Sequence, residues 1–248
     1  GIVHGYLGGQ AGASAMMNVL TGKVNPSGKL NETYPLHYKD TPAYAYYPSK
    51  ERSSEYRESV YVGYRYYTTA GKMTRFPFGF GLSYTTFEYN NLKVNSEGVK
   101  FTVKNTGNMA GTEIAQLYVG KQSDTIFRPV RELKGFKRVE LEPGEEKEVW
   151  ISFDDKSFRF YDTRTDSWEI ESGTYQIMIG ENAEHMLLEG TLEATGTVEN
   201  GGYNKEEMPE YFSGQIKEIS DEEFARLYGK EIPDGSWSGE IQMNDAVC

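Results

Sequence analysis

Carboxylate side chains are the residues of this sequence best suited to acid–base chemistry. Two carboxyl groups held about 5 Å or about 6.5–9.5 Å apart can hydrolyse a glycosidic bond. The chain holds 37 acidic residues, but they fall in predicted loops and on exposed strand faces, and nothing in their spacing selects a pair. Glu32 and Asp40 lie nearest to a glycine-rich helix start and are the only acids that this position singles out. The pattern assigns neither of them a catalytic role.

Residues for nucleophilic or metal chemistry are scarce. The single cysteine, Cys248, is the last residue, so no internal disulfide and no cysteine zinc site is expected. The histidines at positions 4, 37 and 185 are too scattered for a metal site. No G-x-S-x-G nucleophile elbow is present. We therefore predict no catalytic residue, no metal and no cofactor in this chain.

Glycines cluster at the start of a predicted helix over residues 10–22. Gly8, Gly9 and Gly12 resemble a phosphate-binding loop, but the Lys-Ser/Thr pair of a P-loop is missing. Gly28 to Leu30 stand where the acidic ribose partner of a dinucleotide site would be. Close backbone packing at a helix start is the preferred interpretation. The helix places an apolar face at three- and four-residue spacing, formed by Ala13, Met16, Met17 and Leu20.

Charge and hydropathy limit the partners. The formal net charge is −11, and no basic patch offsets it, so nucleic acid is not an expected partner. No apolar run approaches the roughly 18 residues of a membrane span, and no membrane association is expected. The chain opens Gly-Ile-Val-His without Met, as a piece of a longer protein would. The sequence therefore does not determine the cellular compartment, although a cytoplasmic location is favoured over a secreted one. It does not determine whether the protein forms a homo-oligomer either.

The N-terminal third mixes a helix with extended segments. Lys29 to Tyr34 is predicted to be a single strand, ended by Pro35, whose sheet must be completed by other residues. Residues 36–60 are predicted to run over a surface. Their charged residues are interpreted as a solvated face: Glu51, Arg52, Glu55, Arg57 and Glu58.

A tyrosine-rich segment follows at residues 59–67. Its alternation predicts a strand with Val60, Val62, Tyr64 and Tyr66 on one face. Tyrosine rings can stack on sugars, but packing within an interface is the preferred reading. The segment of residues 75–87 contains six aromatic or leucine side chains, and Pro77, Gly79 and Gly81 are interspersed among the first four of them. We predict a domain junction here.

Residues 85–195 show a β pattern throughout. Short alternating segments separated by turns predict an immunoglobulin-like β-sandwich of fibronectin type, without a disulfide. The predicted strands lie near residues 99–104, 114–119, 133–141, 149–153, 158–161, 167–170, 175–179 and 186–192. The fold class is thus mainly β, with the sandwich preceded by an incomplete α/β segment, residues 1–84.

Residues 196–248 form a predicted C-terminal extension with one short helix, Asp221 to Tyr228. Ser220 is its expected N-cap, and Glu223 stands where a capping box needs it. Gly229 ends the helix, and Phe224 and Leu227 are expected to dock on the body of the protein because so short a helix is not stable alone.

Several motifs together resemble the C-terminal half of glycoside hydrolase family 3. They occur in the order of that family: residues 6–12 (YLGGQAG), 22–35, 56–67 (YRESVYVGYRYY) and 76–87 (FPFGFGLSYTTF). Segments of the sandwich are similar to the family's fibronectin type III-like domain: residues 105–107, 115–119, 132–136, 142–145 and 173–180, with Arg128, Pro129 and Trp168. Residues 224–233 resemble an extension of bacterial β-glucosidases in the family.

The resemblance implies a retaining β-glucosidase whose barrel and α/β sandwich precede the fibronectin-like domain. An aspartate nucleophile on the barrel and a glutamate acid/base upstream of Tyr6 would act on terminal β-linked glucose, so neither is carried over to this chain. Ala11 replaces a glutamate of some relatives without removing a catalytic group. The expected role of this chain is structural, and the chain alone is expected to be inactive. A β-glucoside or oligosaccharide substrate would bind through other domains of the enzyme.

Two alternatives stay open. Residues 85–195 could be an independent module that binds carbohydrate or protein. The family assignment could hold with a different sugar, as in a β-xylosidase.

Overall fold

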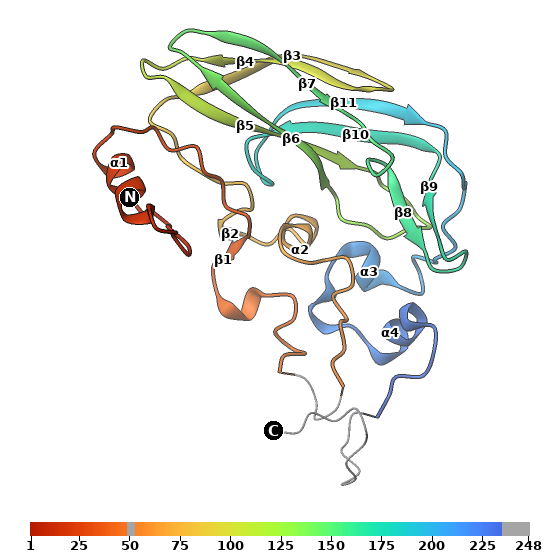
Figure 1. Cartoon of the computed structure of the whole chain (residues 1–248). Helices are drawn as coiled ribbons and strands as arrows, with labels where there is room; N and C mark the ends of the chain where they lie inside the picture. The colour runs from red at the N-terminus through yellow and green to blue at the C-terminus, as the bar shows by residue number, and fades with distance from the viewer. Residues whose placement is uncertain (49–52, 235–248) are drawn as a thin grey trace.

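The computed structural model describes residues 1–48 and 53–234, and a β-sandwich forms its main body (Figure 1). One sheet has the order β11-β10-β5-β6 and the other β3-β4-β7, with antiparallel pairing throughout. This confirms the predicted mainly β, fibronectin-like fold. The strands are β3 (Phe87–Asn95), β4 (Gly98–Asn105), β5 (Gly111–Gly120), β6 (Glu132–Leu141), β7 (Glu146–Ser152), β10 (Gly173–Gly180) and β11 (Met186–Ala194). No helix in the described parts of the chain is long and apolar enough to cross a membrane.

The core of the sandwich follows from the alternation of apolar residues. Val99, Phe101 and Val103 of β4 are buried and belong to one cluster with Leu117 of β5 and Ile177 of β10. In a strand, every second side chain points to the same face. The apolar positions of both sheets therefore meet between them, and no disulfide is needed to hold the sheets together.

Strand β3 was not predicted as a separate strand, and a bulge explains why. Its apolar residues Phe87 and Tyr89 are two apart, but the next, Leu92, follows after three. The pairing with β4 shifts between Asn90 and Lys93, where Asn91 has a φ of 62°. One extra residue in a strand reverses the phase of the alternation, so the pattern does not register as a strand.

Strand β5 is buried on both faces. Ala115, Leu117 and Val119 face the sandwich core, whereas Gln116 and Tyr118 are buried on the other side. Tyr118 belongs to a second apolar cluster that includes Tyr64 and Phe78 from the N-terminal third. The sandwich therefore carries a second packing surface, on which the preceding residues lie.

The N-terminal third contains few regular elements. Helix α1 (Gly12–Leu20) confirms the predicted helix. The predicted strand 29–34 is wrong in extent, because only β1 (Tyr34–Pro35) pairs, with β2 (Thr74–Phe76). A 3₁₀ turn, η1 (Tyr38–Asp40), follows.

The strand predicted at residues 59–67 is also wrong, because the chain forms helix α2 (Tyr64–Thr69) there. The residues before the helix form turns, and Gly63, with a φ of 54°, occupies the N-cap position of α2. Tyr66, Tyr67 and Ala70 are all buried, a spacing that one helical face can supply and a strand cannot.

The C-terminal extension holds more structure than the one helix predicted. Helix α4 (Asp221–Tyr228) has the predicted bounds, with Ser220 as N-cap and Gly229 as its left-handed end. Helix α3 (Pro209–Ser213) and the 3₁₀ turn η2 (Ile216–Glu218) were not predicted. Phe224 and Leu227 dock on the protein as predicted. The capping box is incomplete, because the Glu223 side chain accepts a hydrogen bond from the Tyr211 N–H instead.

The hairpin predicted near the end of the sandwich is present. It consists of β8 (Arg159–Asp162) and β9 (Ser167–Ile170), joined by a polar turn. In Figure 1 the hairpin and α4 lie on the side of the molecule away from α1.

Candidate functional site

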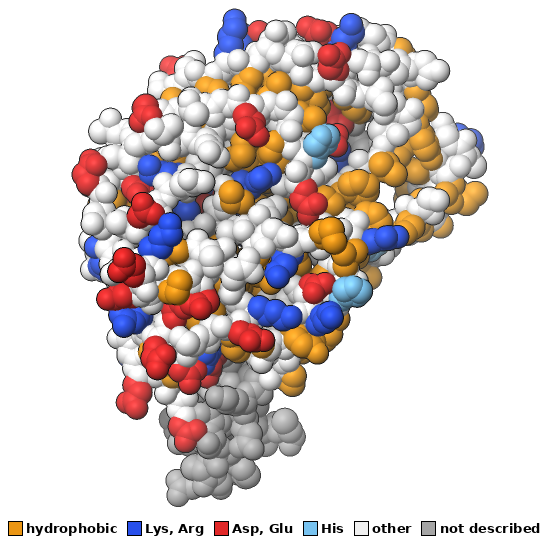
Figure 2. Space-filling view, turned by 180° about the vertical axis from the view of Figure 1, so that it is seen from behind, with side chains coloured by type: hydrophobic (Ala, Val, Ile, Leu, Met, Phe, Trp, Pro, Cys, Tyr) orange, Lys and Arg blue, Asp and Glu red, His pale blue; other side chains and the backbone are white. Residues whose placement is uncertain are grey.

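A broad apolar surface covers the N-terminal segment. None of the described residues before Arg57 is buried. The apolar face predicted for α1 is open to solvent: Met16, Met17 and Leu20 are exposed, as is Leu7. Figure 2 shows hydrophobic side chains gathered along this flank. Large contiguous apolar patches on a protein mark surfaces that contact another body.

Residues 78–80 form a junction that bonds in two directions. On one side, the Gly79 N–H donates to the Leu30 carbonyl at 2.7 Å, and the Leu30 N–H donates to the Phe80 carbonyl at 2.8 Å. On the other side, the Phe78 carbonyl accepts from the Ala183 N–H of the sandwich at 2.9 Å. The same three residues therefore hold the N-terminal segment and the sandwich together.

Gln116 completes this junction from the outer face of β5, the face on which the N-terminal third packs. Its amide nitrogen donates to the carbonyls of Gly79 (3.2 Å) and Glu181 (2.7 Å), and its amide oxygen accepts from the Tyr118 hydroxyl at 2.7 Å. Gly79 has a φ of +80°, and a Cβ there would lie 2.2 Å from the Gln116 oxygen. The close approach therefore requires glycine at position 79.

Side-chain contacts add to the backbone contacts at the junction. The Asn25 amide donates to the Ala110 carbonyl at 2.9 Å and accepts from the Ser83 hydroxyl. Lys29 and Glu113 form an ion pair of 3.0 Å that is largely buried. A buried ion pair contributes more to one fixed arrangement than to net stability, and this pair fixes how residue 29 sits on β5.

The candidate acid Glu32 belongs to a small polar cluster near the start of the chain. The Tyr34 hydroxyl lies 2.8 Å from His4 Nδ1 and donates to Glu32 at 3.3 Å, and the His4 ring stacks on Tyr6. Loss of solvent, and then the charge of Glu32, raises the pKa of Tyr34 to about 12. Tyr34 therefore stays protonated and acts as a donor.

The other candidate residues lie apart from this cluster. Asp40 accepts from the backbone N–H of His37 at 3.2 Å and so caps the turn η1. His185 contacts Glu181 in the sandwich. No interaction joins Glu32 to Asp40 within residues 1–48 and 53–234. No group of three or more metal-binding side chains occurs in these residues either.

One pair of carboxyl groups does come together, at Glu210 and Glu223. Burial raises the pKa of Glu223 to about 7, and a hydrogen bond with Glu210 adds to the increase. A raised carboxyl pKa is a feature of general acids. However, Glu223 is 3% exposed and its Oε1 is bonded to the Tyr211 N–H at 3.0 Å. It therefore holds α3 against α4 and does not reach a substrate.

The tyrosines of residues 61–67 lie in the interior. Tyr61, Tyr66 and Tyr67 are buried in one cluster. The cluster also contains Phe127, from the connection between β5 and β6, and Tyr211 of the extension. The Tyr61 hydroxyl donates to the Tyr211 carbonyl, and the Tyr211 hydroxyl donates to the Arg57 carbonyl at 3.0 Å. Packing, the preferred interpretation of this segment, is confirmed for these three rings.

Arg57 was predicted to lie on a solvated face, and this prediction is wrong. Its side chain is buried, with ion pairs to Glu55 (2.6 Å) and Asp221 (2.5 Å) and a hydrogen bond of 2.8 Å to the Ile219 carbonyl. The guanidinium lies over the rings of Tyr46 and Phe224. Burial alone would lower the pKa of Arg57, but the bonds from Asp221 and Glu55 raise it. Glu51 and Arg52, also assigned to that face, lie outside the described residues.

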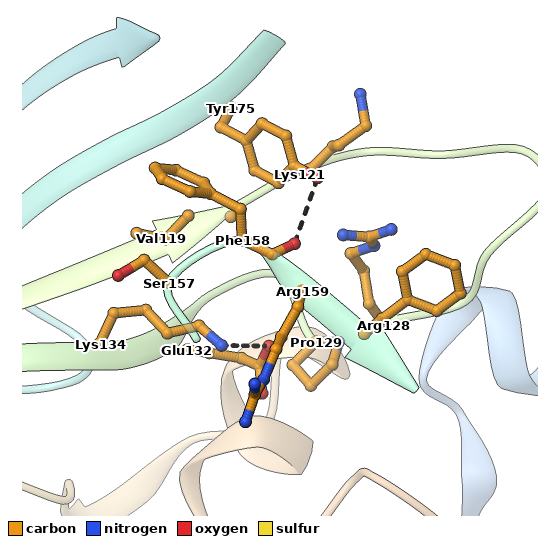
Figure 3. A pocket seen from close by; sticks show the side chains of 12 residues that line it. Val119, Lys121, Arg128, Pro129, Glu132, Lys134, Ser157, Phe158, Arg159 and Tyr175 are labelled. Carbon is orange, nitrogen blue, oxygen red and sulfur yellow. Dashed lines mark hydrogen bonds and ion pairs between the residues drawn. The ribbon is translucent and has the colours of Figure 1, made fainter. Parts of the chain in front are cut away.

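A small cavity beside β8 has a basic lining but does not form an anion site. It has a volume of about 30 Å³, which holds water only. Figure 3 shows that its cations point in different directions around the backbone of Phe158. Each has its own partner: Lys134 pairs with Glu132, Arg128 with Glu171 and Arg159 with Asp155, while Lys121 lies over the Tyr175 ring.

Comparisons with known proteins match both parts of the chain. Residues 1–84 match the family model described as the glycosyl hydrolase family 3 C-terminal domain, and residues 113–183 match a fibronectin type III-like domain. A thermostable beta-glucosidase B from Acetivibrio thermocellus is 44% identical over 205 residues, which cover 79% of this chain and 27% of the relative. An exo-alpha-(1->6)-L-arabinopyranosidase from Bifidobacterium breve is 39% identical over 201 residues, with the same two coverages.

Solved structures agree with these matches. A GH3 beta-glucosidase from Bifidobacterium adolescentis superposes with a TM-score of 0.74 at 36% identity, over 77% of this chain and 29% of that chain. A beta-glucosidase from Kluyveromyces marxianus in complex with glucose gives a TM-score of 0.72 at 37% identity, over 76% of this chain and 23% of that chain. The chain thus spans about a quarter of the length of the curated relatives it matches.

Proposed function

The chain belongs to glycoside hydrolase family 3, and from this membership we propose that it is the C-terminal part of a retaining β-glucosidase. The whole enzyme would release terminal β-linked glucose from a β-glucoside or oligosaccharide. The names of the relatives support this substrate class, and the retaining mechanism follows from the family resemblance. The reacting carboxylates would lie outside these 248 residues, since Glu32 and Asp40 each bond to local partners.

The role of this part would be to brace the catalytic domains. One observation carries the proposal: residues 78–80 bond to Leu30 on one side and to the sandwich on the other. The N-terminal segment, whose apolar side chains are exposed, is thereby fixed to a rigid sheet. A catalytic domain that packs on this segment would inherit a fixed orientation, which positions reacting groups without contacting them.

The test compares the 248 residues alone with the same residues joined to the missing N-terminal domains. We expect the chain alone to have no activity on an aryl β-glucoside and the joined protein to hydrolyse it. Turnover by the 248 residues alone would overturn the assignment of the reacting carboxylates.

The sugar is tested in the same assay. An aryl β-xyloside and an aryl α-L-arabinopyranoside are added as parallel substrates. We expect the highest kcat/KM on the β-glucoside. A higher value on either of the other two would replace the β-glucosidase proposal with that specificity and leave the bracing role intact.

A further inference from the structure

A groove lies between the turn of the β8–β9 hairpin and the C-terminal extension. Its volume is 490 Å³, within the roughly 300–1,000 Å³ of small-ligand sites. Neither matched family model includes the extension, which forms most of the groove. The residues that matter for its chemistry are Thr163, Arg164, Tyr203, Glu207, Arg226 and Tyr228. Two elements that contribute to its lining, the β8–β9 hairpin and α4, lie in Figure 1 on the side of the molecule away from α1.

Arg164 is anchored in one orientation at the edge of this groove. Its guanidinium makes two bonds to Asp162, at 3.0 and 2.6 Å, and a third to the Asn200 carbonyl. Asp162 is 0% exposed, and the bond from Arg164 lowers its pKa. Gly202, with a φ of +78°, allows the close approach, because a Cβ there would lie 1.9 Å from Arg164 Nη1. The side chain is therefore pre-organised.

The opposite wall carries a second arginine with its own partner. Arg226 Nη1 bonds to Glu207 Oε2 at 2.5 Å. Both side chains are about half exposed. Among residues 1–48 and 53–234 this is the one side-chain bond that either residue makes, so Glu207 Oε1 and the other N–H groups of Arg226 can meet a ligand. A carboxylate beside a guanidinium offers an acceptor and donors together. A pair of neighbouring hydroxyl groups, each both donor and acceptor, fits that arrangement.

The groove carries little net charge. Arg164 is balanced by Asp162 and Arg226 by Glu207, and the remaining lining residues are uncharged. Leu227, which is partly exposed, supplies apolar surface, and Tyr203, whose hydroxyl lies 3.2 Å from Thr163 Oγ1, adds a ring with a polar edge. A neutral ligand with apolar C–H faces and hydroxyl edges matches this lining.

We propose that this groove binds a β-linked oligosaccharide, as a site for the sugar chain that is separate from hydrolysis. The choice of β-linked glucose rests on the proposed function, whereas the neutral, polyhydroxylated character of the ligand comes from the groove itself. The site would hold part of a longer chain on the protein.

The test measures binding of cellotetraose and laminaritetraose to the 248 residues by titration calorimetry, with maltotetraose to report linkage. Thr163→Trp fills the groove from an exposed turn and should abolish binding. Arg226→Ala should weaken it about tenfold, the equivalent of one hydrogen bond to a charged group. Arg138→Ala is the matched control, because Arg138 is an exposed arginine paired with Glu140 on β6, outside the groove. It should bind as the unchanged protein does.

Three results would overturn the proposal: no binding of either β-linked sugar, equal binding by both groove variants and the unchanged protein, or binding only after removal of residues 235–248. The last would make that segment the occupant of the groove. Hydrolysis of an aryl β-glucoside by the joined protein separates the two proposals. We expect Thr163→Trp to leave it unchanged, so a failure of sugar binding with intact hydrolysis rejects the groove alone.

Discussion

At the scale of single residues, buried polar groups decide more than the visible motifs do. Both the nitrogen and the oxygen of the Gln116 side-chain amide are hydrogen-bonded, and Gly79 allows the close contact because it has no Cβ. Neither residue stands out in the sequence, because a glutamine within an alternating strand resembles a solvated residue. Its partner Gly79 is 37 residues away, so no local pattern reveals the contact. The sequence predicted the junction from its aromatic residues, but not the bonds that make it.

The Gly79→Ala variant tests this contact. The new methyl group needs an unfavourable φ, which costs about 1–2 kcal/mol, and it also collides with Gln116, which adds about 1–3 kcal/mol. Urea denaturation measures the loss. Gly144→Ala is the control, because Gly144 has a φ of +77° and open space around it, so only the first cost applies. Equal losses in the two variants would contradict a specific role for the Gln116 contact.

Glu223 makes the packing of α3 against α4 within the extension depend on pH. Its pKa in the folded protein is about 7 because of burial and Glu210, whereas an unfolded glutamate has a pKa of about 4.3. The folded state therefore binds the proton more tightly, and this stability is present at low pH and lost as pH rises through 7.

Glu223→Gln should remove that loss. We expect the variant to be more stable than the unchanged protein at pH 8, by on the order of 1 kcal/mol, and to differ little at pH 4.5. Thermal denaturation at the two pH values measures this difference. Glu140→Gln, at an exposed ion pair, should change stability by less than about 1 kcal/mol at both. A Glu223→Gln variant that is less stable at pH 8 would refute the assignment.

At the scale of elements, local signals were predictable and long-range ones were not. The bounds of α4 follow from Ser220 and Gly229, which act on their own helix. Helix α3 carries comparable signals, Pro209 at its first turn and Gly214 at its end, but five residues are too few for a periodic pattern. At residues 59–67 both periodicities fit the sequence, and packing of the tyrosines against the extension chose the helix.

The contacts of Arg57 with the C-terminal extension were not predicted from the sequence. Two of its partners, Ile219 and Asp221, are 162 and 164 residues away, and its neighbours in sequence are charged and polar. The groove was missed for a similar reason, since the hairpin turn and the extension that line it are separated in sequence.

Replacing Arg57 by alanine should release the extension. Loss of the guanidinium leaves the largely buried Glu55 carboxylate without this ion pair, and breaking such a pair costs about 3–5 kcal/mol. Limited proteolysis should then cut within residues 209–228 at a lower protease concentration than in the unchanged protein. Arg138→Ala, which breaks an exposed pair, should leave the digestion pattern unchanged. An unaltered pattern in Arg57→Ala would show that the aromatic cluster alone holds the extension.

At the scale of the whole molecule, stability is concentrated in the sandwich. Its core joins every strand of both sheets, whereas none of the described residues before Arg57 is fully buried. The family resemblance predicted this imbalance, because residues 1–35 resemble only the closing elements of a larger α/β body.

Hydrogen exchange of the 248 residues should display the imbalance directly. We expect the slowest amides in residues 85–195, above all in the central strands β4, β5 and β10, and fast exchange across most of residues 1–60. Amides are protected when their opening requires unfolding of packed structure. Uniform slow exchange across residues 1–60 would show that this segment is folded independently of other domains.

The bond from Arg57 to Ile219 has a consequence for how the chain tolerates change. It joins two residues that are 162 positions apart in the chain, and the segment between them contains the whole sandwich. The entropy lost on closing such a loop grows only with the logarithm of its length, so a doubling adds about 0.6 kcal/mol. Extra residues inserted into the surface turns of the sandwich, such as the polar turn between β8 and β9, should therefore leave the hydrogen bond between Arg57 and Ile219 intact.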